Sequence, residues 1–258
     1  MSVRAKKKLG QHFLNDENTV KKIIHSILEL NAQSILEIGP GMGILSKYLY
    51  QHDFSFSAVE IDTESVEYLN KKYPNMKVIL GDFLKMDTSL LISDNTFIVG
   101  NFPYNISSQI FFKVIEYKNQ IPGLIGMIQK EVAERIIEKE GSKTYGILSV
   151  LLQTYYDIEY LFTVNENVFT PPPKVKSAVI KLTRNKRKEL ACDEKLYFRL
   201  IKESFGQRRK MIRSSLKQHL SNIGDCQFLT KRPEQLSVDD FIKLTQAVET
   251  KKNIKFVT

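Results

Sequence analysis

Residues 101–104, with the sequence Asn-Phe-Pro-Tyr, combine side chains that could hold and activate a planar amine. They follow the apolar run at 96–100, which predicts a buried strand. In open α/β sheets, ligands bind beyond that end of the strands. The amide oxygen of Asn101 and the carbonyl of Phe102 could each accept one N–H of an exocyclic amine, which would leave its lone pair free for attack. Tyr104 could stack on a base taken out of its helix. The alternative is a proline turn with a capping asparagine.

A glycine-rich loop lies upstream, at residues 37–43 (Glu-Ile-Gly-Pro-Gly-Met-Gly), between an expected strand and an expected helix. Gly39 and Gly41 would let the backbone approach a ligand, and the helix would offer free N–H groups. The spacing differs from the Gly-x-Gly-x-x-Gly of dinucleotide binders, and no Gly-Lys-Ser/Thr follows, which excludes a P-loop. Taken alone, the loop also fits a tight strand-to-helix turn.

Two acidic residues follow the next two expected strands. Glu60 lies at the end of the second strand, where a carboxylate can accept both hydroxyls of a ribose. Asp82 follows the third strand, within reach of an adenine amine in such a sheet. Each acid by itself could be a helix cap or a solvated loop residue. One acid after each successive strand, together with the glycine loop, indicates a site for a nucleoside cofactor.

Alternating elements must position these residues. Asp16 can cap a helix that runs to about residue 30. Strands are expected at 34–38, 56–61, 77–80, 96–100 and 124–128, and helices at 44–50, 63–73, 106–117, 131–138 and 145–154. A strand pair is expected at 158–164 and 177–182. This order predicts an α/β fold with a mostly parallel sheet and right-handed crossovers.

The pattern changes after the charged linker at 184–188, beyond which everything is predicted helical. We therefore expect a basic arm at 1–15, an α/β domain at 16–183 and a small helical domain at 189–258. A helix from about residue 207 would carry an apolar stripe of Ile212, Leu216 and Leu220. Its neighbouring basic face would hold Arg208, Arg209, Lys210, Arg213 and Lys217. That face could contact an RNA backbone or could simply be solvated.

The net charge of the 258 residues is +9, and it is unevenly distributed. Residues 1–8 hold four basic and no acidic residues, and 184–258 hold 18 basic and 9 acidic residues. Basic ends on a near-neutral body suggest a nucleic-acid surface, although a solvated basic surface is the alternative. No apolar run of about 18 residues and no signal-peptide pattern occurs, so we expect no membrane segment and a cytoplasmic protein.

No cysteine or histidine has a partner at metal-ligand spacing, so no metal site is predicted. Cys192 and Cys226 form no disulfide pattern. His25, His52 and His219 are expected to be structural or surface residues. No Ser/His/Asp or Cys/His arrangement suggests nucleophilic catalysis.

The chain resembles the ribosomal RNA adenine dimethyltransferases of the KsgA type, from the arm to the helical domain. The resemblance is carried by residues 9–14 (Leu-Gly-Gln-His-Phe-Leu), 37–43, 59–62 (Val-Glu-Ile-Asp), 81–82 (Gly-Asp), 101–107 (Asn-Phe-Pro-Tyr-Asn-Ile-Ser), 168–175 (Val-Phe-Thr-Pro-Pro-Pro-Lys-Val) and 205–210 (Phe-Gly-Gln-Arg-Arg-Lys).

The resemblance implies a Rossmann-like class I methyltransferase fold with S-adenosyl-L-methionine as methyl donor. The donor would contact His12, Leu14, Gly39, Gly41, Glu60, Asp82 and Asn101. Two methyl groups would pass to each of two adjacent adenines near the 3′ end of small-subunit (16S) rRNA, during small-subunit biogenesis. Phe169 would lie against the target base, opposite Tyr104. Arg208, Arg209 and Arg213 would contact RNA, and the partner would be the small ribosomal subunit, bound by a monomer.

Two positions depart from the commonest family pattern. His12 stands where asparagine is usual, and Phe102 stands where leucine is usual. Two other functions remain as alternatives: a large-subunit (23S) rRNA adenine N6-methyltransferase that confers macrolide resistance, and a mainly non-catalytic ribosome-assembly factor. A map of the modified bases in both rRNAs would distinguish the 23S methyltransferase from the 16S methyltransferase. The presence of Glu60, Asp82 and Asn101 argues against a purely non-catalytic assembly factor.

Overall fold

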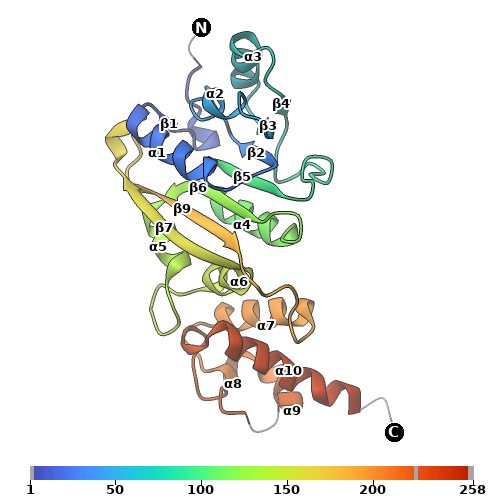
Figure 1. Cartoon of the computed structure of the whole chain (residues 1–258). Coiled ribbons are helices and arrows are strands. Elements are labelled where there is room, and N and C mark those ends of the chain that lie inside the picture. The colour runs from blue at the N-terminus through green and yellow to red at the C-terminus, as the bar shows by residue number, and fades with distance from the viewer. Residues whose placement is uncertain (1–2, 224–225, 255–258) are drawn as a thin grey trace. The chain divides into compact units, whose positions relative to one another are not determined.

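The computed structural model describes residues 3–223 and 226–254, which form two compact units (Figure 1). The first unit contains the residues up to Ala133 and Asp157–Arg184, and the second contains Glu134–Tyr156 and the residues from Asn185 onward. The sequence-based domain bounds remain a prediction. The structure groups residues 134–156 with the second unit because α6 (Ile147–Tyr155) contacts α7 (Glu194–Gly206) and α10 (Val238–Ile254).

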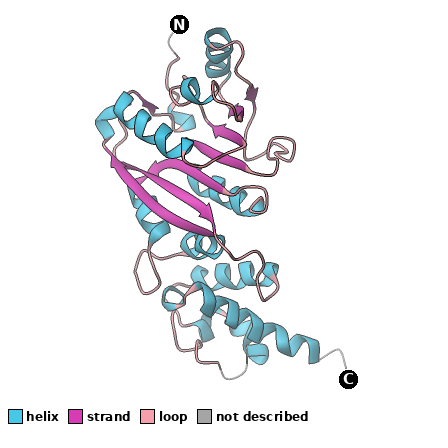
Figure 2. Cartoon of the chain, viewed as in Figure 1, coloured by secondary structure: helices cyan, strands magenta, loops and turns pink. Residues whose placement is uncertain are grey.

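A seven-stranded sheet forms the centre of the first unit, in the order β4-β3-β2-β5-β6-β9-β7 (Figure 2). The strands are β2 (Ser34–Ile38), β3 (Ser55–Glu60), β4 (Val78–Leu80), β5 (Thr96–Asn101), β6 (Gly123–Gln129), β7 (Tyr156–Val164) and β9 (Ser177–Arg184). Strands β4, β3, β2, β5 and β6 are parallel to one another, and β9 is antiparallel to β6. The predicted Rossmann-like α/β fold is confirmed.

Helices connect these strands as the apolar periodicity predicts. They are α1 (Glu17–Leu28), α2 (Ser46–Leu49), α3 (Thr63–Lys72), α4 (Ser107–Glu116) and α5 (Lys130–Ile137). Asp16 caps α1, since its carboxylate accepts the Thr19 N–H over 2.7 Å. The buried face of α1 joins a core cluster that includes residues of β2, β5, β6 and β9.

A second, two-stranded sheet was not predicted. β1 (Phe13–Leu14) pairs antiparallel with β8 (Phe169–Thr170), so that Leu14 lies opposite Phe169. The Asn15 N–H also donates to the Val168 carbonyl over 2.9 Å. The Asn15 side-chain amide also donates to the Thr170 hydroxyl over 2.8 Å, across 155 residues of sequence. The end of the expected basic arm is therefore bound to a segment far along the chain.

The second unit is helical, but the continuous helix predicted from residue 207 is wrong. The chain instead makes a turn at 207–210 and then forms α8 (Ile212–Ser215), a 3-10 helix (Lys217–His219) and α9 (Leu220–Ile223). The Ile212 N–H donates to the Lys231 carbonyl over 2.8 Å, so this distant bond replaces a bond from an earlier helical turn. Ile212 and Leu216 are buried as expected, and Leu220 is half-buried. Within residues 3–223 and 226–254, no helix has the length and apolarity needed to cross a membrane.

Candidate active site

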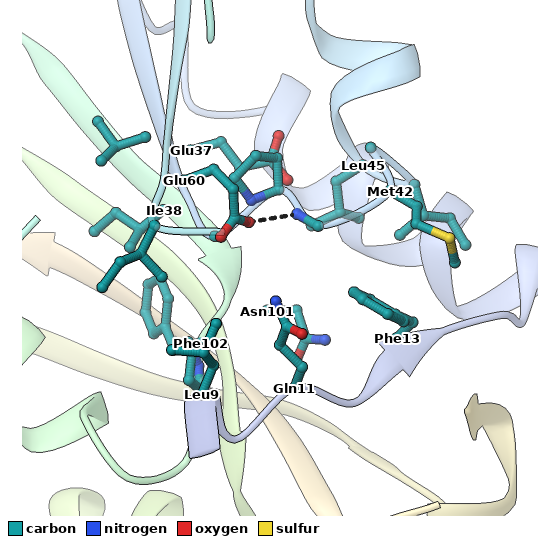
Figure 3. Close-up of a pocket in the computed structure, with 18 of the residues that line it drawn as sticks. Leu9, Gln11, Phe13, Glu37, Ile38, Met42, Leu45, Glu60, Asn101 and Phe102 are labelled. Atoms are coloured by element: carbon teal, nitrogen blue, oxygen red, sulfur yellow. Dashed lines mark hydrogen bonds between the residues drawn. The ribbon is translucent and has the colours of Figure 1, made fainter. Parts of the chain in front are cut away.

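A cavity of about 380 Å³ lies in the first unit, at the carboxyl ends of β2, β3, β4 and β5 (Figure 3). Parallel strands meet at that edge, as expected for a ligand site in an open α/β sheet. Most of its walls are formed by residues 9–15, 37–45, 59–61, 81–83 and 101–104. The structure thus brings the arm, the glycine loop, both acids and residues 101–104 around one space.

The glycine loop passes close to the arm. Gly41 has φ 56°, in the left-handed region that favours glycine. A Cβ atom placed on Gly41 would lie 2.9 Å from the Phe13 ring, which also lines the cavity. Glycine is therefore required here for two reasons, backbone conformation and the close approach of Phe13.

Glu60 is 3% exposed, and its carboxylate holds the loop in place. Its Oε2 accepts the Gly41 N–H over 3.0 Å, the bond drawn in Figure 3, and its Oε1 accepts the Asp62 N–H over 2.9 Å. Burial raises the pKa of Glu60, and these backbone N–H groups oppose that rise. Each carboxylate oxygen has a second lone pair, so both can accept a further hydroxyl.

Asp82 lies beyond the end of β4, the strand beside β3. Its Oδ1 accepts the Leu84 N–H over 3.0 Å, and its Oδ2 lies 3.6 Å from the Lys85 Nζ. The side chain is 28% exposed and lines the cavity. A carboxylate with remaining acceptor capacity therefore stands next to Glu60 along the sheet edge, in the predicted order.

Asn101 is the last residue of β5, and its amide has a defined orientation. Its Nδ2 donates to the His12 backbone carbonyl over 2.9 Å. Since a carbonyl can only accept, the NH₂ group faces the arm, and the Oδ1 atom remains available as an acceptor beside the cavity. The next residue, Phe102, places its ring in the core, where a Cβ on Gly126 would lie 2.3 Å from it. Any contribution of Phe102 to the cavity is thus made by its backbone.

The Tyr104 side chain is contacted at its hydroxyl and on one face of its ring. Its hydroxyl shares a hydrogen bond of 2.5 Å with the Ser177 hydroxyl, and burial raises its pKa, so that the phenol stays neutral. The His12 ring stacks on the Tyr104 ring, with 5.5 Å between centroids and 27° between planes. The His12 Nδ1 donates to the Pro171 carbonyl over 2.8 Å. His12 therefore contributes its backbone to Asn101 and its ring to Tyr104.

Phe169 is buried in the first unit, and its expected contact with a target base stays a prediction. Its side chain is 2% exposed and does not line the cavity described above. It belongs to the core cluster together with Leu14 and residues of α1, because the pairing of β8 with β1 carries it there. Among the predicted aromatic pair, only Tyr104 lies at the cavity.

The arm is anchored by contacts that the sequence did not reveal. The Lys6 ammonium pairs with the Asp62 carboxylate and, over 2.9 Å, with Glu64. The Gln11 Nε2 donates to Asp62 Oδ2 over 3.4 Å, and the Lys6 N–H donates to Gln11 Oε1 over 2.8 Å. Asp62 is buried and follows Glu60 by two residues, so one short stretch of chain both lines the cavity and binds the arm.

Glu37 also lines the cavity and was not predicted to matter individually. It is almost fully buried and accepts the Ser46 hydroxyl over 2.6 Å. Burial raises its pKa to about 8, an effect that the Ser46 bond opposes and the charge of Glu60 adds to. Position next to the glycine loop is the only sequence signal that could have identified Glu37. Across the part of the chain that the structure describes, no group of His, Cys, Asp and Glu is arranged to hold a metal ion.

The predicted RNA contacts lie in the second unit and differ from one another. Arg208 is half-buried, and its guanidinium donates to the Lys143 carbonyl and, over 3.4 Å, to the Ser142 carbonyl. Arg209, Arg213 and Lys217 are exposed. Arg208 therefore has a structural task within its unit, whereas the others present their charge to solvent.

The fold and the cavity define the class of protein: a class I S-adenosyl-L-methionine-dependent methyltransferase. Two solved structures share the fold. A dimethyladenosine transferase from Plasmodium falciparum has a TM-score of 0.78 at 24% identity, covering 93% of this chain and 98% of that one. The 23S rRNA methyltransferase ErmE has a TM-score of 0.65 at 25% identity, covering 91% and 99%.

The family follows from sequence comparison. The model of the ribosomal RNA adenine dimethylase family matches residues 2–257, so the chain belongs to that family. A relative from Parabacteroides distasonis, named ribosomal RNA small subunit methyltransferase A, is 55% identical over 250 residues, which cover 94% of this chain and 93% of the relative. The family resemblance predicted from the motifs is confirmed.

Proposed function

We propose that this protein transfers methyl groups from S-adenosyl-L-methionine to the N6 amines of two adjacent adenines near the 3′ end of small-subunit rRNA. The observation that carries the chemistry is the oriented amide of Asn101, whose Nδ2 donates to the His12 carbonyl over 2.9 Å, so that Oδ1 is the atom left to accept a substrate amine. Identity of 55% to a small subunit methyltransferase, against 25% to the 23S enzyme ErmE, supports the choice of RNA.

The cavity suits the methyl donor. A nucleoside needs acceptors for its ribose hydroxyls and its base amine, and Glu60 and Asp82 supply these in the order of the strands. Both Glu60 oxygens are already aligned by backbone N–H groups, which leaves their second lone pairs for a diol. Gly39, Gly41, Leu14 and His12 form the adjoining walls. S-adenosyl-L-methionine supplies an electrophilic methyl group when it is bound.

The acceptor adenine must leave its helix to be reached. Asn101 Oδ1 and the Phe102 carbonyl would accept its two amine N–H bonds, and Tyr104 would stack on its ring. Because the His12 ring stacks on one face of Tyr104, a base would have to stack on the other face. Fixed dipoles and orientation favour attack by the nitrogen lone pair, so no strong general base is needed.

The remaining parts of the proposal concern the partner. The basic arm and the exposed Arg209 and Arg213 would contact phosphates of the small subunit, with Arg208 supporting the loop beside them. The protein would act as a monomer. Work on assembling small subunits would place the protein in the cytoplasm.

The test incubates the protein and isotopically labelled donor with small subunits that lack the modification, with naked small-subunit rRNA and with large subunits. Mass spectrometry then locates dimethyladenosine. We expect label on two adjacent adenines of the small subunit and none with Asn101→Ala. Label confined to large-subunit rRNA would favour the 23S alternative, and binding to small subunits without any label would favour the assembly factor.

A further inference from the structure

Ser177, the first residue of β9, lies behind the acceptor side of the cavity. It is fully buried and does not line the cavity. Its Oγ lies 2.5 Å from the Tyr104 Oη, although 73 residues separate the two in sequence. The register of β9 on β6 sets its position, since Ser177 lies opposite Gln129.

The same part of the chain also holds the neighbour of Tyr104. Pro171 accepts the bond from the His12 ring over 2.8 Å, and Thr170 accepts one from the Asn15 amide over 2.8 Å. The segment 170–177 therefore supports both stacked rings, Tyr104 through its hydroxyl and His12 through its Nδ1. The backbone end of Tyr104 has its own support, since its carbonyl accepts the Ser107 hydroxyl over 3.3 Å.

We propose that Ser177 is a positioning residue for methyl transfer: its hydroxyl fixes the Tyr104 ring so that a stacked adenine presents its amine to Asn101. This inference rests on the proposed function. A tyrosine ring pivots about its Cβ, so the hydroxyl end moves furthest when the ring is unrestrained. A hydrogen bond at that end is thus the most effective restraint, and small misplacements of a reacting group cost large factors in rate.

The alternative is a structural role, in which Ser177 only provides a hydrogen-bond partner for the partly buried Tyr104 hydroxyl. The chain offers a matched pair that separates the two readings. In the second unit, the Thr154 hydroxyl lies 2.8 Å from the buried Tyr197 hydroxyl, in the same chemical arrangement. Breaking that bond should affect stability alone, because neither residue lines the cavity.

The experiment is a double-mutant cycle on methyl transfer to unmodified small subunits at saturating donor. We expect Ser177→Ala and Tyr104→Phe each to lower kcat about 10-fold with donor Kd little changed, and to lower Tm by about as much as the matched variants of the second unit. The double variant should be no slower than the slower single variant, because both single changes remove the same bond. Ser177→Thr keeps the hydroxyl and should recover most of the rate. Thr154→Ala and Tyr197→Phe should lower Tm and leave kcat unchanged.

Two results would overturn the inference. An unchanged kcat for Ser177→Ala would leave the serine with a structural role, and multiplying losses in the double variant would show that the two hydroxyls act separately. If the wild-type protein modifies large-subunit RNA instead, the proposed function is wrong, and the same cycle on that RNA still decides the role of Ser177. A wild-type protein that methylates no RNA overturns both proposals.

Discussion

The side-chain amide of Asn101 donates to the backbone carbonyl of His12 over 2.9 Å, across 89 residues of sequence. This bond joins the arm to the end of β5 and determines which atom of the amide faces the arm. The acceptor oxygen is then available for a substrate amine. The arm is therefore part of the candidate site, and its attachment controls the orientation of the residue that we propose activates the amine.

Replacing Asn101 by Asp tests that orientation directly. The variant has nearly the same shape, but it loses the donor to the His12 carbonyl and places a charge in the cavity wall. We expect kcat for methyl transfer to fall at least about 100-fold, the range measured when an oriented polar group is removed from an active site. Circular dichroism should stay near the wild-type spectrum, and Tm should fall by no more than a few degrees, the cost of the lost bond to the arm. Near-normal turnover would be incompatible with the proposed role.

The close approach of the glycine loop to the arm predicts a loss of donor affinity for Gly41→Ala. The new Cβ would lie 2.9 Å from the Phe13 ring and would displace it from the cavity wall. Donor Kd, measured by calorimetry, should rise about 10-fold. Gly141→Ala is the control, because Gly141 also has a positive φ, 94°, but a Cβ added there would meet nothing within 4 Å. Both variants should lose about 1 kcal/mol of stability from the strained backbone, and equal Kd values for the two would contradict the prediction.

The buried Glu37 predicts a pH dependence of stability. Its pKa is raised from 4.5 to about 8 in the folded protein, so the folded state binds more protons than the unfolded state between those values. The contribution of Glu37 to the free energy of unfolding is therefore greatest below about pH 4.5 and is lost as the pH rises toward 8. Glu37→Gln is neutral at every pH. The Tm of the variant relative to wild type should increase by several degrees from about pH 5 to 8. A constant difference would mean that Glu37 titrates normally.

The anchor of the arm predicts an effect of Asp62 on donor exchange. Asp62→Asn removes the charge that holds Lys6 and weakens the bond from Gln11, so the wall formed by residues 9–14 should open more often. We expect donor dissociation, followed by stopped-flow fluorescence, to become several-fold faster, with little change in kcat at saturation. Asp239→Asn breaks the Arg187–Asp239 pair (2.7 Å) in the second unit and should leave dissociation unchanged. Equal rates in wild type and Asp62→Asn would show that the arm does not limit release.

The exposed arginines of the second unit predict a salt-dependent effect on RNA affinity. Arg209→Glu combined with Arg213→Glu should weaken binding to small subunits about 10-fold or more near 0.15 M salt. The slope of log K against log salt should become shallower by about 2, because each lost phosphate contact removes a released counterion. An unchanged slope would identify the face as merely solvated. Arg208→Ala should instead lower Tm, because its guanidinium binds two carbonyls of its own unit.

Local patterns were sufficient for much of the fold. The alternation of apolar strands and amphipathic helices up to β6 depends on near neighbours, and all five expected parallel strands occur with small shifts at their ends. The order of the glycine loop, Glu60, Asp82 and Asn101 is also a local property, because each follows a strand and parallel strands bring their carboxyl ends to one edge. For that reason the sequence alone predicted which of these residues line the cavity.

Contacts between residues far apart in the sequence decided the features that the local patterns did not predict. The β1–β8 ladder placed Phe169 in the core, and bonds from Ile212 and Arg213 to residues 229–231 replaced the predicted long helix with short pieces. The contacts of α6 grouped residues 134–156 with the helical unit. Residues 101–104 show both contributions, that of the local sequence and that of tertiary folding. Their types and position were evident in the sequence, whereas the direction of the Asn101 amide and the restraint on Tyr104 depend on His12 and Ser177, which only tertiary folding brings to them.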